Sequence, residues 1–203
     1  MEPWLVAGLG NPGPTYEANR HTIGYHVVAE LARRFGVRFG APRGLRADVA
    51  EARLGTPGAS GPEAARVIVM KSRTYMNETG GSVAGVLNYF KITPDRLVVV
   101  HDELDLDPGQ LRVKFGGGDN GHNGLRSIRK AVGTGDFFRV RIGVGRPPGR
   151  QDPADFVLQP FSARERDDIA VTIEEAADAA VMLVTQGLVA AQDRYNHGPN
   201  SSG

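Results

Sequence analysis

The sequence predicts a single α/β domain, with a twisted mixed β-sheet flanked by α-helices. Short apolar runs typical of strands alternate with longer segments whose apolar residues recur at helical spacing. Residues 1–196 contain no internal repeat and no linker between two cores, and a chain of 203 residues can bury one good core. Residues 197–203 follow the last predicted helix, and we expect them to form a disordered tail.

The first third of the chain contains one predicted helix among strands. Residues 4–9 form a short apolar run ended by glycine and proline, which predicts a buried strand. Apolar side chains recur at helical spacing in residues 20–35, and Gly36 stands where a helix C-cap belongs, so we expect a helix there. Two strands are predicted at residues 45–54 and 66–71. The loop that joins them, residues 55–65, is rich in glycine, proline and serine.

The remaining elements continue this alternation. Strands are predicted at residues 96–101, which contain Leu97-Val98-Val99-Val100, and at residues 110–115 and 138–144, where the pattern alternates. Helices are predicted at residues 79–91 and 188–195, and a third begins at about residue 123. A long helix is predicted to begin at the capping-box pattern Ser162-Ala163-Arg164-Glu165.

Composition excludes several classes of site. The chain has no cysteine, which rules out disulfides, thiolate metal sites and a cysteine nucleophile. No apolar run approaches the ~20 residues that a membrane-spanning helix needs. The first residues carry no cationic segment ahead of an apolar stretch, so we expect no signal peptide and a cytoplasmic protein.

The net charge of +1 conceals an uneven distribution along the chain. Residues 110–150 hold nine basic and two acidic residues, whereas residues 151–203 hold three basic and nine acidic ones. A dense basic block favours a polyanionic partner, because lysine and arginine on phosphates release condensed counterions. On charge alone, a solvated basic surface explains the block equally well.

The segment Gly8-Leu9-Gly10-Asn11-Pro12-Gly13 matches the glycine fingerprint of dinucleotide-binding proteins. That fingerprint requires the loop to lead directly into a helix whose N-terminus holds the pyrophosphate. Pro12 and Pro14 disfavour helical backbone at the residues before them, and the next predicted helix begins near residue 20. We therefore expect a tight loop after a strand here, not a nicotinamide or flavin site.

Polar side chains gather at four predicted strand-to-loop junctions. These junctions contain Asn11, Tyr16, Arg20 and His21; Tyr75-Met76-Asn77; residues 101–105; and residues 116–124. Sites in open α/β sheets lie at the carboxyl ends of strands, so we expect these junctions to converge. Each residue also has a structural explanation, since asparagine beside glycine and proline often forms turns and most lone histidines are not catalytic.

The residue types at these junctions favour attack by water on an acyl group. The segment Gly80-Gly81-Ser82-Val83-Ala84 lacks the last glycine of a serine nucleophile elbow and lies in a predicted helix. A metal site in residues 101–105 lacks the paired histidines of a zinc helix, and neighbouring strand residues point to opposite faces. A histidine base, a carboxylate that orients it and carboxamides that hold a carbonyl remain.

The basic block predicts contact with phosphates. If a helix begins near Asn123, the side opposite its apolar residues carries Arg126, Arg129 and Lys130. Gly121 permits close approach of a backbone, and the helix N-terminus offers free N–H groups. Few aromatic residues lie among these charges, which favours phosphate contact over base stacking.

Four motifs, taken together, resemble those of bacterial peptidyl-tRNA hydrolases, and the resemblance extends from Leu5 to about Tyr195. The motifs are GLGNPGPTYEANRHTIG (8–24), YMNETG (75–80), HDELDLDPG (101–109) and GGGDNGHNGLRSI (116–128). The resemblance implies a monomeric enzyme, without metal or cofactor, that cleaves the ester between a peptide and the 3′-terminal ribose of tRNA. A non-catalytic RNA-binding protein on the same fold is the alternative, but binding alone would not require His21, Asp102, Asn11 and Asn77 together.

The resemblance also assigns roles to individual residues. It implies that His21 activates water, Asp102 orients His21, and Asn77 positions the substrate and helps to stabilise the oxyanion. It further assigns substrate contact near the ester to Asn11, peptide binding to Asn123, shaping of the cleft to Tyr16 and Met76, and tRNA phosphates to Lys114 and Arg141.

This chain departs from the family pattern at three places. Asn19 and Thr22 stand where the family usually has threonine and asparagine, so no contact of an asparagine can be carried over to position 22. Asp119-Asn120 interrupts the second glycine motif and puts an acid near the substrate channel. We expect altered loop dynamics or peptide contacts there, not a loss of activity.

Overall fold

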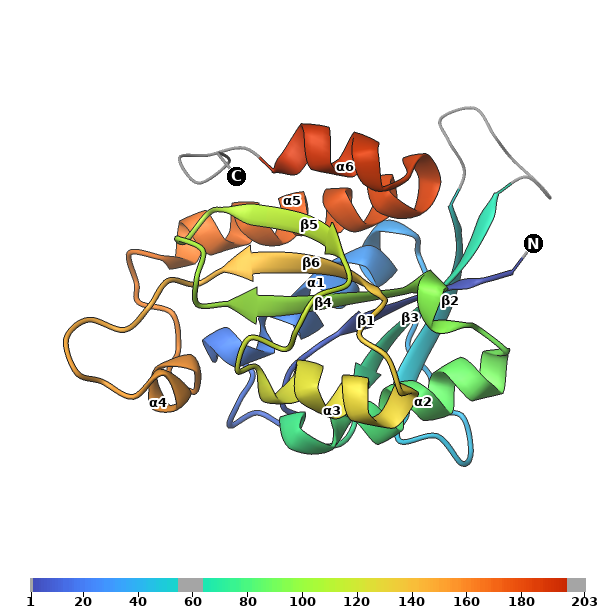
Figure 1. Cartoon of the computed structure of the whole chain (residues 1–203), viewed down its shortest axis with the longest axis horizontal. Helices are drawn as coiled ribbons and strands as arrows, with labels where there is room; N and C mark the ends of the chain where they lie inside the picture. The colour runs from blue at the N-terminus through green and yellow to red at the C-terminus, as the bar shows by residue number, and fades with distance from the viewer. Residues whose placement is uncertain (1, 55–63, 197–203) are drawn as a thin grey trace.

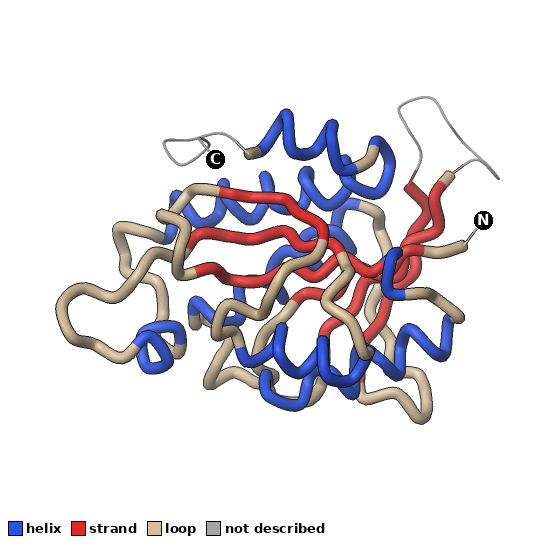
Figure 2. The backbone as a smooth tube through the Cα atoms, in the orientation of Figure 1, coloured by secondary structure: helices blue, strands red, loops and turns tan. Residues whose placement is uncertain are grey.

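A six-stranded β-sheet with helices on both faces organises the residues that the computed structural model describes, 2–54 and 64–196 (Figures 1 and 2). The strand order is β2-β3-β1-β4-β6-β5. The predicted tail, 197–203, and most of the predicted loop, 55–65, lie outside the described residues. This architecture confirms the predicted single α/β domain with a mixed sheet.

The four central strands are parallel and the two edge strands are antiparallel to their neighbours. The strands are β1 (Trp4–Gly8), β2 (Ala47–Leu54), β3 (Ala65–Ser72), β4 (Leu97–Glu103), β5 (Leu111–Phe115) and β6 (Phe138–Gly143). Every residue of β4 is buried, as its run of valines predicts for a strand covered on both faces. The arrowheads of β4 and β6 point toward the same end of the molecule in Figure 1.

Two hydrophobic cores lie on opposite faces of the sheet. Helices α1 (Ile23–Arg34), α5 (Arg166–Gln186) and α6 (Leu188–Tyr195) belong to one face, and α2 (Thr79–Phe90) and α3 (Asn123–Val132) to the other (Figure 1). Successive residues of β1 alternate between them, with Val6 in the first core and Leu5 and Ala7 in the second. No helix in the described part of the chain is long and apolar enough to cross a membrane.

The glycines of the first motif allow close packing of α1 on β1. A Cβ on Gly8 would overlap the carbonyl of Gly24, and a Cβ on Gly24 would overlap the backbone of Leu9 and Val100. A Cβ on Gly10 would lie 2.8 Å from the side chains of Thr22 and Tyr25. These glycines therefore serve packing. The chain after β1 forms a loop, as expected, and leads through turns into a 3₁₀ turn, η1 (Arg20–Thr22).

Several predicted boundaries are wrong. The predicted helix at residues 20–35 begins with η1, and α1 starts only at Ile23. Strand β4 continues to Glu103, so Asp102 and Glu103 belong to the strand and do not follow it. Helix α5 starts at Arg166, and only half of the predicted capping box forms, with the Ser162 amide donating to Glu165 Oε2 at 2.7 Å.

A short helix, α4 (Pro153–Val157), was not predicted. Asp152 caps it, accepting a hydrogen bond from the Ala154 amide at 3.0 Å, and Pro153 occupies its first turn. Five residues are too few to show a helical period, so the sequence pattern could not reveal it.

Candidate active site

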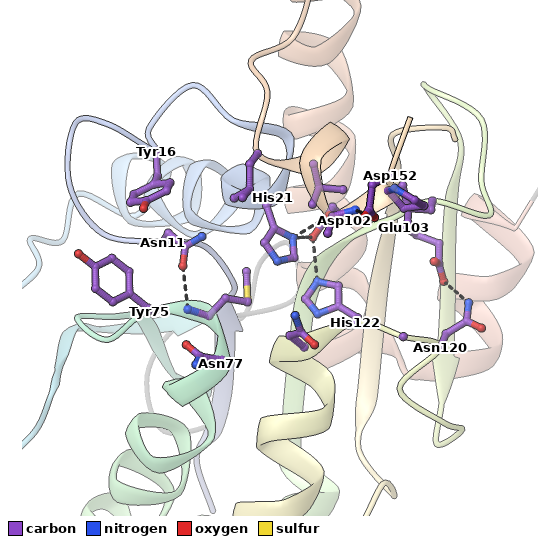
Figure 3. A pocket seen from close by; sticks show the side chains of 18 residues that line it. Asn11, Tyr16, His21, Tyr75, Asn77, Asp102, Glu103, Asn120, His122 and Asp152 are labelled. Atoms are coloured by element: carbon purple, nitrogen blue, oxygen red, sulfur yellow. Dashed lines mark hydrogen bonds and ion pairs between the residues drawn. The ribbon is translucent and has the colours of Figure 1, made fainter. Parts of the chain in front are cut away.

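A cleft of about 580 Å³ opens where the predicted junctions meet (Figure 3). Its walls come from the loop after β1, the 3₁₀ turns η1 and η2 (Met76–Glu78), the end of β4, the start of α3, and α4. All the residues predicted to act in catalysis or substrate binding line it: Asn11, Tyr16, His21, Met76, Asn77, Asp102, Gly121 and Asn123. The structure thus brings together segments that are far apart in the sequence, from Asn11 to Leu158.

His21 and Asp102 form a buried pair at the centre of the cleft. His21 Nδ1 lies 2.9 Å from Asp102 Oδ2 and 3.0 Å from Oδ1, and the residues are 9% and 3% exposed. Because an ionised carboxylate only accepts hydrogen bonds, Nδ1 carries the proton and donates it to Asp102. The imidazole Nε2 then holds a lone pair, as a general base requires.

His122 is a second imidazole on the same carboxylate, and its role was missed in the sequence. Its Nε2 lies 2.8 Å from Asp102 Oδ1 (Figure 3). Its Nδ1 accepts from the amides of Gly124 and Leu125 at 3.1 and 3.3 Å, so His122 is the N-cap of α3. A ring nitrogen that accepts cannot carry the proton, so Nε2 donates to Asp102. The only signal in the sequence was the position of His122 immediately before the predicted start of a helix.

The electrostatics of this group favour an ionised carboxylate and a basic His21. Burial opposes the charge of Asp102, but the imidazoles of His21 and His122 hold the pKa of its carboxyl well below the usual range. Burial lowers the pKa of His21, and the charge and hydrogen bond of Asp102 more than offset this, so the pKa of His21 is raised above 6.5. His21 is therefore a stronger base than an ordinary histidine.

Asn11 has its carboxamide orientation set by the backbone of η2. Its Oδ1 accepts a hydrogen bond from the Met76 amide at 2.7 Å (Figure 3), which leaves its NH₂ group to donate elsewhere. The backbone N–H of Asn11 donates to Thr22 Oγ1 at 3.3 Å. Thr22, one of the departures from the expected pattern, therefore supports the loop that carries Asn11.

Asn77 and Asn123 present exposed carboxamides at the cleft wall. Asn77 lies in η2 and Asn123 is the first residue of α3. Neither side chain forms a hydrogen bond to another described residue, although both line the cleft. Their donors and acceptors are available to a bound molecule.

Two apolar surfaces complete the cleft. Tyr16 and Tyr75 meet edge to face, with ring centroids 5.9 Å apart, and Met76 lies buried beside them. A second surface comes from the α4 segment, whose contributing residues are Pro153, Ala154, Val157 and Leu158. The cleft therefore combines a few convergent polar groups with apolar walls, which is typical of a substrate site.

Comparison with known proteins identifies the family. The family model described as "Peptidyl-tRNA hydrolase" matches residues 5–202. The chain belongs to the peptidyl-tRNA hydrolase family. It is 57% identical to the peptidyl-tRNA hydrolase of Cutibacterium acnes over 97% of this chain and 100% of that protein. Identity to the Frankia casuarinae peptidyl-tRNA hydrolase is 54%, over 96% of this chain and 94% of that protein.

Solved structures of the family agree with the fold. The crystal structure of peptidyl-tRNA hydrolase from Acinetobacter baumannii is 32% identical in sequence, with a TM-score of 0.82. The match covers 95% of this chain and 94% of that one. The resemblance stated from the four motifs is confirmed.

The residues predicted to bind tRNA lie outside the cleft of this family member. Arg126, Arg129 and Lys130 are exposed on α3, and Lys114 is half-buried on β5. Burial, and then the charges of Arg141 and Arg139, lower the pKa of Lys114. Arg141 is paired with Glu103, its Nη2 lying 2.6 Å from Oε1. The predicted tRNA-binding cations on α3 are thus exposed, whereas Arg141 is already neutralised by the buried Glu103.

Asp119 was expected near the substrate channel, and it stands one residue before Asn120, which lines the cleft. Asp119 does not line the cleft; its Oδ1 accepts from the Gly121 amide at 3.1 Å, and its Oδ2 lies 3.3 Å from Arg129. The acid therefore shapes the turn before α3 and does not enter the substrate channel. Asn120 does line the cleft, in a left-handed conformation with φ +52°, and donates to Asp105 at 2.7 Å.

The donor set considered for a metal ion is also different in the structure. His101 and Asp102 are adjacent strand residues, and His101 Nδ1 bonds the carbonyl of Asp102 at 2.7 Å. The group in the described chain that could ligate an ion is instead His21, Asp102 and His122, whose ligand atoms lie within 4.8 Å of one another. Within this group, Asp102 accepts hydrogen bonds from both imidazoles.

Proposed function

We propose that this protein hydrolyses the ester bond between a peptide and the 3′-terminal ribose of peptidyl-tRNA, which recycles tRNA from prematurely released peptidyl-tRNA. Family membership over nearly the whole chain supports the reaction. The observation that carries the mechanism is the hydrogen bond from His21 Nδ1 to Asp102, because it leaves Nε2 as a proton acceptor at a cleft.

In the proposed reaction, His21 Nε2 takes a proton from water as the water oxygen attacks the ester carbonyl. The imidazolium that forms is stabilised by the Asp102 carboxylate. Collapse of the tetrahedral intermediate breaks the bond to the ribose 3′ oxygen, and His21 returns the proton to that oxygen. The products are a peptide acid and tRNA with a free 3′ hydroxyl, and no covalent enzyme intermediate is needed.

His122 has a supporting part in this mechanism. Its Nε2–H donates to Asp102, so the carboxylate accepts hydrogen bonds from both sides. Donors to a carboxylate favour its ionised form, which keeps the proton on His21 during the reaction. We therefore include His122 with His21 and Asp102 in the proposed catalytic group.

Carboxamides supply the polar contacts to the substrate in this proposal. Asn77 stabilises the oxyanion and positions the ester, while the NH₂ group of Asn11 contacts the substrate nearby. Asn123 pairs with the peptide backbone, with Gly121 allowing that backbone to approach. A site built to pair with a peptide bond discriminates against an aminoacyl ester that lacks one, because its polar groups are then left unpaired.

The tRNA phosphates would lie against the cations outside the cleft, namely Lys114, Arg126, Arg129, Lys130 and Arg141. We further propose that the enzyme acts as a cytoplasmic monomer without metal or organic cofactor. A purely RNA-binding function would not explain a buried His–Asp–His group, since burial of ionisable side chains costs free energy unless they are paired and used.

The test is release of peptide from N-blocked aminoacyl-tRNA by the purified protein, with and without EDTA. We expect turnover without added metal and an unchanged rate in EDTA. Absence of release would contradict the proposed reaction, and loss of the rate in EDTA would contradict the proton-transfer mechanism without metal.

A further inference from the structure

Arg20 stands next to His21 in η1, yet the proposed chemistry does not use it. The residue is only 6% exposed. A buried guanidinium has a high desolvation cost, which several well-placed partners must offset. Those partners all belong to one distant segment of the chain, residues 156–165.

The guanidinium forms a dense set of contacts with this segment. Nη1 donates to the carbonyls of Phe156, Gln159 and Pro160 at 3.4, 3.3 and 3.0 Å, and Nη2 lies 3.1 Å from Glu165 Oε2. Its central carbon lies 4.0 Å from the ring centroid of Phe156 and 5.5 Å from that of Phe161. The planar guanidinium faces these acceptors at once, with one Nη1 N–H shared between two carbonyls, whereas a lysine ammonium is a single point charge.

The segment held by Arg20 is continuous with the α4 wall of the cleft. Phe156 faces the guanidinium while its neighbours Val157 and Leu158 line the cleft. A helix of five residues has little stability of its own, so its position depends on such tertiary contacts. The backbone adds a hydrogen bond from the Arg20 amide to the Gln159 carbonyl at 3.1 Å.

The chemistry of the α4 wall suits apolar side chains rather than tRNA. Pro153, Ala154, Val157 and Leu158 offer apolar atoms, and the acidic Asp152 stands at the start of the helix. An acid repels phosphates, whereas apolar atoms gain from burying an apolar group. The peptide side chains are therefore the part of the substrate that this wall fits.

We propose that Arg20 is a positioning residue that holds the α4 wall against the turn carrying His21 and so sets the affinity for apolar side chains of the peptide. The inference rests on the proposed function for its substrate. Its physical basis is that one side of the α4 wall contacts the Arg20 guanidinium, while the apolar residues on its other side line the cleft. His21 itself is held by its hydrogen bond to Asp102.

The kinetic test compares wild type with Arg20→Lys on N-acetylphenylalanyl-tRNA and N-acetylglycyl-tRNA. For the phenylalanyl substrate, we expect KM to rise about 10-fold with kcat changed by less than about 3-fold, because uniform binding is lost. For the glycyl substrate, KM should change by less than about 3-fold. The midpoint of the pH profile of kcat/KM should not move. Arg33→Lys, at an exposed site on α1 paired with Glu30, is the matched control and should change neither substrate.

A second measurement does not depend on turnover. In Arg20→Lys, amide hydrogen exchange of residues 154–159 should accelerate while that of β4 stays unchanged. If Arg20→Lys does not fold, Glu165→Gln weakens the same anchor and should give both effects in smaller degree. Equal KM changes for the two substrates, or unchanged exchange at residues 154–159, would overturn the proposal. Lack of turnover by wild type would instead refute the proposed function, and the exchange data would still decide whether Arg20 holds the wall.

Discussion

The Asp102 carboxylate receives hydrogen bonds from two imidazoles, and each imidazole has its tautomer set by a different contact. His122 must donate through Nε2 because its Nδ1 caps α3. His21 donates through Nδ1, so its other ring nitrogen, Nε2, carries no proton and can accept one. The same carboxylate therefore accepts from a histidine that caps α3 and from one whose Nε2 is left free to act as a base.

The pH dependence of kcat/KM follows from the direction of the His21 pKa. The base must be neutral to accept a proton, so kcat/KM should rise with pH through a pKa above 6.5. In Asp102→Asn the attraction of the carboxylate is lost while burial remains, so the rise should move below that pH, with a rate about 10²–10⁴-fold lower. Initial rates across a pH series check both values. A midpoint for Asp102→Asn at or above that of wild type would contradict the assignment.

From the sequence, the residues that line the cleft could be predicted, but not the hydrogen bonds between them. The predicted residues His21, Asp102, Asn11 and Asn77 line the cleft because the carboxyl ends of parallel strands converge. His122 was missed because its bond to Asp102 spans 20 residues and no period in the sequence encodes it. The anchoring of Arg20 on residues 156–165 was missed for the same reason, since its partners are about 140 residues away.

At the scale of elements, glycine spacing decides how closely helices approach. Gly80 of α2 packs on α3, where a Cβ would overlap the carbonyl of Ser127, and its amide donates to Ser127 Oγ at 2.9 Å. Gly81, the next residue, is exposed, and a Cβ there would meet only Arg46 Nη2 at 3.5 Å. The two neighbours therefore form a matched pair.

We expect Gly80→Ala to lower the free energy of unfolding by about 1–3 kcal/mol, because α2 must move away from α3. Gly81→Ala should be neutral or stabilising by up to about 1 kcal/mol, since alanine is the better helix former. Urea denaturation of both variants and wild type measures the difference. Equal effects of the two substitutions would show that the α2–α3 contact is not tightly packed at Gly80.

Most elements could be predicted from the sequence, and the exceptions have physical causes. The last helix, Leu188–Tyr195, was predicted to the residue, and the buried strand β4 was missed only at its ends. Its end was missed because Asp102 and Glu103 are polar, although both side chains have partners in the site, Asp102 with His21 and Glu103 with Arg141. Helix α4 was missed because it has too few residues for a period and is held by tertiary contacts.

At the scale of the whole molecule, some of the cations in the basic block, residues 110–150, are buried or paired and not exposed to solvent. Arg139 is buried on the carbonyls of the glycine loop, donating to Gly117 at 2.7 Å, and Arg141 is paired with Glu103. The acidic C-terminal segment instead meets the side of the molecule near α1, through Glu165 with Arg20 and Asp178 with Arg34. The cations left exposed on α3 are therefore the best candidates for phosphates.

Lys130→Ala should weaken tRNA binding and reduce the slope of log affinity against log salt by about 0.7–0.9, the value for one phosphate contact. Arg33→Ala, on α1 and the opposite face of the sheet, should leave the slope unchanged. Dissociation constants over a salt series measure both. Arg141→Ala is a poorer probe, because it leaves the buried Glu103 without its partner and lowers stability as well. An unchanged slope in Lys130→Ala would remove that residue from the tRNA surface.

The central claim is that His21 is the base that activates water, and one comparison tests it most directly. Peptide release from N-blocked aminoacyl-tRNA should be measured under single-turnover conditions for wild type and His21→Ala, with circular dichroism confirming that both are folded. The proposed mechanism predicts a rate about 10²–10⁴-fold lower for His21→Ala with substrate binding retained. A His21→Ala enzyme with nearly the wild-type rate would contradict it.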